Sequence, residues 1–170
     1  MSYQIVIGSW IQATGAVINA IDQRDSIVLA KMGNVLQAMG NALISDYTEE
    51  ELSKLSNRIQ SIGNLYVVNG LYRRNVQYEI QGNLIQALGG GLGILVAIKE
   101  NDKVDFQGHL LQVIGNSTQA VAGMKEKLKK INASLMDYAG AWIQAIGSII
   151  SAIYATTKLQ EAKALYSGKY

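Results

Sequence analysis

Acidic side chains and a single histidine are the residues of this sequence that could do acid–base or metal chemistry. Asp105, Glu79 and Asp137 each lie seven residues before a glutamine of a common motif, and His109 is the only histidine. Asp105 and Asp137 fall in the first turns of expected helices, where acidic residues stabilise the helix dipole. His109 takes a position that holds Asn or Ser in four other copies of the motif. We therefore interpret His109 as a polar packing residue and not as a base or a ligand.

Other features that could bind a ligand lack the residues that such chemistry needs. The run GGGLG at 89–93 has no Lys-Ser/Thr ending and no preceding strand, so it is not a phosphate-binding loop. We expect it to loosen or kink a helix. The absence of cysteine excludes disulfides and thiolate metal sites. We predict that the protein is not an enzyme and has no catalytic residue, no metal and no cofactor, and we infer no small-molecule substrate.

Six copies of an eight-residue motif, G-x-x-[IL]-Q-[ASV]-x-G, run through the chain, and in the third copy Ser56 replaces the first glycine. The copies are GSWIQATG (8–15), GNVLQAMG (33–40), SNRIQSIG (56–63), GNLIQALG (82–89), GHLLQVIG (108–115) and GAWIQAIG (140–147). Their glutamines follow one another at intervals of 25, 23, 26, 26 and 32 residues. Such spacing is typical of an internal repeat, and each unit could hold one helix of about 20 residues and a short turn.

Helices must position these motifs. No proline occurs in the chain, which suits long helices. The expected helices lie near 3–22, 26–45, 48–69, 75–99, 104–130 and 134–165. The signals for their ends are capping boxes at Thr48–Glu51 and Ser134–Asp137, an opening at Asp25–Ser26, a stop at Asn69–Gly70 and a loop at 99–105. Short connections make consecutive helices antiparallel, so we predict an all-α fold, an up-and-down antiparallel bundle of about six helices in one domain, residues 1–170.

Glycine and glutamine define one face of each expected helix. At 100° per residue the two framing glycines and the glutamine share a stripe, and Trp, Ile and Leu lie on the other side. Glycine in a helix interior costs about 1 kcal/mol relative to alanine, and close approach of two backbones can offset that cost. We interpret the stripes as helix-packing seams, with an amide-lined polar lumen as the alternative. The predicted seam residues are Gly8, Gln12, Gly15, Gly33, Gln37, Gly40, Ser56, Gln60, Gly63, Gly82, Gln86, Gly89, Gly108, Gln112, Gly115, Gly140, Gln144 and Gly147.

The spaced runs WIQAIG, LIQALG, VLQAMG and LLQVIG resemble a family of small repetitive proteins of spore-forming bacilli. The resemblance covers nearly the whole chain, although only the first and sixth copies carry the leading tryptophan. It implies a bacterial source. That family has no assigned activity, so the resemblance implies no functional residue.

Two classes of function fit the composition. Charged residues make up only 16% of the chain, which favours a self-associating structural or interaction protein that forms a homo-oligomer. The alternative is a membrane-active protein, pore-forming or holin-like, because uncharged stretches at 3–21, 80–98 and 138–157 are long enough to span a bilayer. A net charge of +2 does not support nucleic-acid binding, and KEKLKK at 125–130 is interpreted as a solvated helix end. Without a basic segment before its first apolar residues, we expect no cleaved signal and a cytoplasmic location, with membrane association as the alternative.

Overall fold

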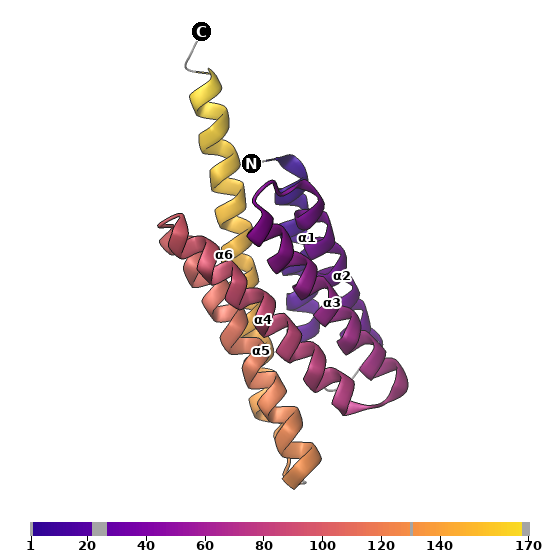
Figure 1. The fold of residues 1–170 in the computed structure, drawn as a ribbon. Helices are drawn as coiled ribbons and strands as arrows, with labels where there is room; N and C mark the ends of the chain where they lie inside the picture. The colour runs from indigo at the N-terminus through magenta and orange to yellow at the C-terminus, as the bar shows by residue number, and fades with distance from the viewer. Residues whose placement is uncertain (1, 22–26, 130, 168–170) are drawn as a thin grey trace.

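The computed structural model describes residues 2–21, 27–129 and 131–167, and Figure 1 shows its helices. These are α1 (Tyr3–Ile21), α2 (Ile27–Tyr47), α3 (Glu51–Arg73), α4 (Val76–Lys99), α5 (Lys103–Lys129) and α6 (Ser134–Ser167). The described part of the chain is 92% helical and holds no strand, which confirms the predicted all-α bundle.

The six helices are arranged as a closed ring. Each helix packs against the next one along the chain, and α1 packs against α6. Within the described residues, helices that are not neighbours in this ring make no close backbone contacts. The molecule is therefore a barrel of antiparallel helices around a common axis, and α6 extends beyond the others at its C-terminal end (Figure 1).

The distribution of side chains is the reverse of that in an ordinary globular protein. The largest side chains that are fully buried are amides and hydroxyls, namely Gln37, Gln112, Asn41, Asn64, Asn116, Ser45, Ser56 and Ser148. The buried apolar residues are mostly alanine. Large apolar side chains lie outside instead, as at Leu88, which is 61% exposed in the middle of α4. Globular proteins in water bury Leu and Ile and expose Asn and Gln.

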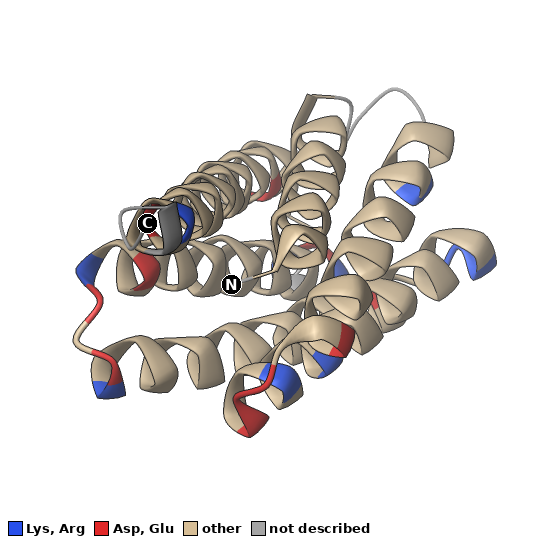
Figure 2. Cartoon of the chain, turned by 90° about the horizontal axis from the view of Figure 1, so that it is seen from above, with Lys and Arg blue, Asp and Glu red and all other residues tan. Residues whose placement is uncertain are grey.

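Charged residues gather at the two ends of the barrel. Figure 2 shows them mainly at helix ends and in the connections, with long uncharged stretches between. The stretches without Lys, Arg, Asp or Glu are 3–21, 32–45, 59–72, 80–98, 106–124 and 138–157. Four helices, α1, α2, α4 and α6, are long and apolar enough to cross a membrane by length and composition. An uncharged belt therefore surrounds the middle of the molecule.

Both predicted capping boxes are wrong, and one helix begins three residues later than predicted. Helix α3 begins at Glu51, and the Glu50 carboxylate caps it by accepting a 2.5 Å hydrogen bond from the backbone N–H of Ser53. Helix α2 continues to Tyr47, so Thr48 directly follows its last turn. Thr48 therefore donates its hydroxyl to the carbonyl of Ile44 in α2 and does not cap α3. Ser134 is the first residue of α6 and donates to the Asn132 side chain, so it is not the cap of a box with Asp137.

Glycines predicted to end or loosen helices instead lie inside them, where they allow close contacts between helices. Helix α3 continues through Gly70 and ends at Arg73, and a Cβ on Gly70 would lie 2.8 Å from the backbone nitrogen of Glu79. Helix α4 runs unbroken through 89–93, contrary to the expectation of a loosened helix. The predicted loop at 99–105 is shorter, since α4 ends at Lys99 and α5 begins at Lys103. The predicted opening at 25–26 lies outside the described residues.

Candidate functional site: the amide-lined interior

The six motif glutamines form a buried layer inside the barrel. Gln12, Gln37, Gln60, Gln86, Gln112 and Gln144 are each at most 4% exposed. Each belongs to a different helix, and the alternating helix directions leave the motifs level with one another near the middle. The seven-residue frame of the motif turns the glutamine to the same side of its helix as the glycines, so all six amides lie inside.

Hydrogen bonds across the axis connect glutamines of helices that are not neighbours in the ring. The Gln144 amide on α6 donates to Gln37 on α2 at 2.7 Å and to Gln86 on α4 at 3.1 Å. The Gln12 amide on α1 donates to Gln112 on α5 at 3.3 Å. Side chains, and not backbones, therefore connect helices that are separated by one helix in the ring.

The framing glycines lie where paired helices touch. A Cβ on Gly15 in α1 would come within 2.5 Å of the carbonyl oxygen of Gly33 in α2, and a Cβ on Gly40 within 2.5 Å of that of Gly8. The same kind of contact joins α3 to α4 and α5 to α6, at Gly63 with Gly82, Gly115 with Gly140 and Gly147 with Gly108. Without a Cβ, each of these three hairpins can bring its backbones into direct contact.

Ser56 occupies a position that is glycine in the other five copies of the motif, and its hydroxyl makes hydrogen bonds that glycine could not make. Its hydroxyl donates a 2.8 Å hydrogen bond to the carbonyl oxygen of Gly89, its counterpart on α4. It also accepts a hydrogen bond from the Gln60 amide at 3.4 Å. At this one position the helices are joined by a side chain where the other copies have bare backbone.

Several buried amide atoms in the described interior have no hydrogen-bond partner within the protein. They are Gln37 Nε2, Asn41 Nδ2 and Oδ1, Asn64 Oδ1, Asn116 Oδ1 and Gln119 Oε1. A buried amide left unpaired costs about 1–3 kcal/mol, and such groups in native proteins normally bond to ordered water or to a bound molecule. The interior is therefore suited to hold water or small polar molecules.

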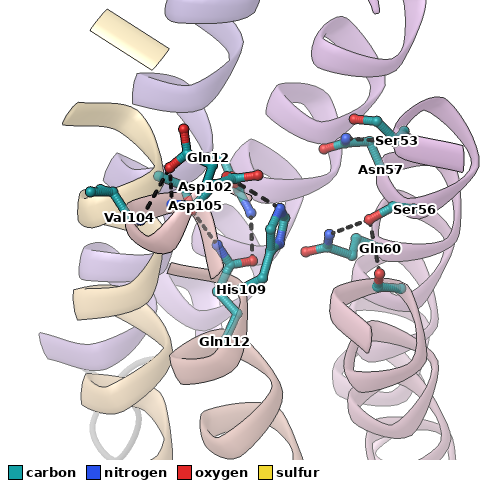
Figure 3. A network of polar contacts seen from close by, with 12 residues as sticks. Gln12, Ser53, Ser56, Asn57, Gln60, Asp102, Val104, Asp105, His109 and Gln112 are labelled. Atoms are coloured by element: carbon teal, nitrogen blue, oxygen red, sulfur yellow. Dashed lines mark hydrogen bonds and ion pairs between the residues drawn. The ribbon is translucent and has the colours of Figure 1, made fainter. Parts of the chain in front are cut away.

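A cavity of about 440 Å³ opens from the glutamine layer toward the end of the barrel where α1 begins. We call it the vestibule. Its floor includes Gln12, Gln60 and Gln112, and its walls carry the side chains Glu49, Glu50, Glu100, Asp105, His109, Tyr47 and Tyr154. Figure 3 shows Gln12, Asp105, His109 and Gln112 as one group, with Ser53, Asn57 and Gln60 as a second group beside it.

The three acidic residues that lie seven residues before a motif glutamine do not form one cluster, because they are divided between the two ends of the barrel. Asp105 lies in the vestibule, with its carboxylate 3.6 Å from Nε2 of His109 one turn later. Glu79 and Asp137 lie near each other and near Glu126 at the opposite end. No group of three or more potential metal ligands occurs in the described residues.

Two carboxyls at the rim of the vestibule have lowered pKa values. The Ser53 backbone N–H, with help from the ammonium of Lys99 at 3.3 Å, lowers the pKa of Glu50. Burial raises the pKa of Asp102, but the backbone N–H of Asp105 and the ammonium of Lys158, 3.1 Å away, outweigh it and lower the pKa overall. Both rim carboxylates are therefore charged near neutral pH.

Sequence reasoning missed the vestibule because its walls come from helix ends outside the motif. Glu49 and Glu50 were treated only as parts of a capping signal, and Tyr47 and Tyr154 belong to no pattern. The available signal was the position of the polar residues three before and four after each glutamine. Ser9, Asn41, Asn57 and Ser148 occupy such positions, and all four are buried.

Comparison with known proteins gives a family and no activity. No curated protein and no solved structure matches the chain. A family model described as a family of unknown function, DUF6944, matches residues 3–152. Because the match covers most of the amide-lined barrel, the chain belongs to this family of unknown function.

Proposed function

We propose that this protein is a membrane-embedded helical barrel of the pore-forming class, in which an apolar exterior faces lipid and an amide-lined interior forms a polar compartment. The observation that carries the proposal is the reversed placement of side chains. Amides and hydroxyls fill the interior, while Leu88, Leu95 and Ile98 are each more than half exposed on α4. Lipid is the surrounding for which such an exterior is suited, and it needs no partner protein.

The dimensions of the uncharged belt agree with a bilayer. The stretches 3–21, 80–98, 106–124 and 138–157 are 19 or 20 residues long, or about 29 Å at 1.5 Å per residue, and a hydrocarbon core is about 30 Å thick. The stretches in α2 and α3 are shorter and are bounded by Lys31 and Arg58. Long basic side chains at such positions can extend to the headgroups.

Mean hydropathy understates the apolar character of the outer surface. Its value for the whole chain is only +0.11, which is low for a chain that spans a membrane. That average includes the buried Gly, Asn, Gln and Ser of the interior. In a barrel these residues do not contact lipid, so the composition of the outer face determines whether the helices can span a membrane.

Self-association is the second candidate, and one observation favours it. Helices α3 and α5 are not among the four helices apolar enough to cross a membrane alone. Exposed apolar residues such as Ile62 and Leu65 on α3 could be covered by another copy of the chain. A water-dispersed assembly would then have a mass well above 18.4 kDa by light scattering without detergent. The membrane proposal predicts aggregation or loss of the protein under those conditions.

Fractionation tests the proposed function directly. The expressed full chain should sediment with membranes, stay there in alkaline carbonate and be released by mild detergent. Recovery of a stable monomer or defined oligomer in detergent-free buffer would contradict the membrane proposal. A defined oligomer would support self-association.

A matched pair of lysine substitutions separates lipid from water as the surrounding of the belt. Leu88→Lys places a charge in the middle of α4, whereas Leu135→Lys places one at the start of α6, where the side chain is 74% exposed. A lysine at mid-membrane costs about 2.5–3.5 kcal/mol, so Leu88→Lys should reduce the membrane-bound fraction while Leu135→Lys leaves it unchanged. If both variants fractionate like the unsubstituted protein, the belt does not face lipid.

A further inference from the structure

We infer that the vestibule binds a small organic ammonium ion, one with a compact apolar body around the cationic nitrogen. This inference rests on the proposed function, since it names the class of molecule that the polar compartment accepts. The cavity of about 440 Å³ falls within the range of small-ligand sites, about 300–1,000 Å³.

The charges that face the vestibule favour a cation. Its lining includes the carboxylates Glu49, Glu50, Glu100 and Asp105 and contains neither lysine nor arginine. Lys99 pairs with Glu50 from the rim, where the lysine side chain is 71% exposed. Lys158 pairs with Asp102 beside the cavity and also interacts electrostatically with Asp105 and Glu100. The four lining carboxylates still outnumber the two neighbouring ammonium groups. An anion in this cavity would meet an excess of like charge.

The uncharged part of the lining favours an organic cation over a bare metal ion. Ile5, Ile44, Val96 and Ala155 contribute apolar surface, and Tyr47 contributes an aromatic ring. The ring of Tyr154 already attracts a cation, because Lys158 Nζ lies 5.4 Å from its centroid. Aromatic rings attract quaternary ammonium groups through the negative face of the π-system. A metal ion would gain nothing from the aliphatic wall, and the described residues include no cluster suited to hold one.

The buried floor supplies hydrogen bonds of fixed direction. Gln12 and Gln112 are bonded to each other, and Gln112 also donates to Ser151 at 3.2 Å. His109, one turn above Gln112, has its Nδ1 atom buried and without a partner in the protein. A bound ammonium ion would therefore lie above a hydrogen-bonded amide floor, with the carboxylates around its charge.

Choline is a suitable probe because a neutral isostere and an anionic analogue of the same shape exist. The full chain in mild detergent is titrated calorimetrically with choline chloride, with 3,3-dimethylbutan-1-ol and with sodium 3,3-dimethylbutanoate. Choline should bind at least about tenfold more tightly than the neutral alcohol, a difference of about 1.4 kcal/mol, and the carboxylate should not bind. Equal binding of the alcohol and choline, or no choline binding up to tens of millimolar, would overturn the inference.

Substitutions then place the binding in the vestibule. Asp105→Asn should weaken choline binding about tenfold, and Asp105→Glu should restore most of it. The matched control is Asp46→Asn, which removes an exposed charge at the same end of the barrel but outside the cavity. An unchanged affinity in a folded Asp105→Asn variant, with helicity checked by circular dichroism, would show that choline binds elsewhere.

The outcomes separate this inference from the proposed function. A membrane-integral protein that does not distinguish choline from its isostere would overturn only the ammonium site. A protein that fractionates away from membranes and still binds choline through Asp105 would overturn the membrane function and keep the site.

Discussion

At the scale of single residues, glycine and glutamine have separate tasks in the motif. The glycines remove side chains where two backbones meet, and the glutamines join helices that are not neighbours in the ring. For each residue type this role predicts a mutational effect opposite in sign to the one that helix propensity or hydrophobicity alone predicts.

Gly147 tests the backbone contact. A Cβ there would lie 2.7 Å from the carbonyl oxygen of Gly108 and 2.8 Å from the backbone nitrogen of Gln112. Gly147→Ala should therefore lower the free energy of unfolding by about 1–3 kcal/mol, and Gly147→Leu by more, although propensity predicts a gain of about 1 kcal/mol.

Gly91 is the matched control, because a Cβ there meets nothing within 4 Å. Thermal melting followed by circular dichroism should show Gly91→Ala as stable as the unsubstituted protein or more so. A Gly147→Ala variant that melts at or above the unsubstituted temperature would remove close packing as the reason for the glycine.

Gln144 tests the amide layer. Its side chain donates to both Gln37 and Gln86, so Gln144→Leu leaves two buried carbonyl oxygens without their donor. We expect a loss of about 1–3 kcal/mol for each oxygen, although leucine is the more apolar residue. Gln81→Leu, on the exposed face of α4, makes the same chemical change outside the barrel and should have little effect on the melting temperature. Equal melting temperatures for the two variants would mean that the layer does not stabilise the barrel.

At the scale of elements, the start of α3 depends on a charge that is not part of the motif. The pKa of Glu50 is lowered, first by the Ser53 backbone N–H and then by Lys99. A lowered pKa adds stability that is present above the ordinary value of 4.5 and is lost as the pH falls through the lower folded value. Glu50→Gln should therefore lower the melting temperature at pH 7 and flatten its decline below pH 4.5.

A second variant separates the two causes of the lowered pKa. Lys99→Met removes only the smaller contribution, because the Ser53 N–H still reaches the carboxylate. Melting curves from pH 7 to pH 3 should show this variant close to the unsubstituted protein. If Lys99→Met flattens the curve as much as Glu50→Gln does, the ion pair and not the helix cap is the main cause.

At the scale of the whole molecule, closure of the ring between α1 and α6 decides whether one chain makes one barrel. Ala16 and Ala145 lie in one buried alanine cluster between these helices, and the chain has no native cysteine. The double variant Ala16→Cys/Ala145→Cys should form a disulfide within a single chain on mild oxidation, seen as a faster monomer band on non-reducing gels. The control pair, Ala16→Cys/Ala97→Cys, joins helices that do not touch and should stay reduced. Crosslinked dimers from the first pair would mean that α1 packs on α6 of another copy.

The sequence alone determined the helices and the two faces of each one. The glycine and glutamine spacing placed Gln12, Gln60 and Gln144 at equivalent points of their helices, and the helix positions agree closely with those in the structure. Local signals were weaker: Asn69–Gly70 predicts a helix stop, but the helix continues, because a glycine that serves a contact with Glu79 looks the same in sequence as one that ends a helix.

Only the tertiary structure decided which face is inside. A period of 3.6 residues separates an amide–glycine face from an apolar face, but burial depends on what the face meets, and that partner is another helix or the surrounding medium. Ring closure between α1 and α6 turned the amides inward and left Leu88 and its neighbours outside. The vestibule likewise required the fold, because Glu50, Asp105 and Tyr154 are far apart in the chain and meet only where the starts of α3 and α5 lie around the same cavity as α6.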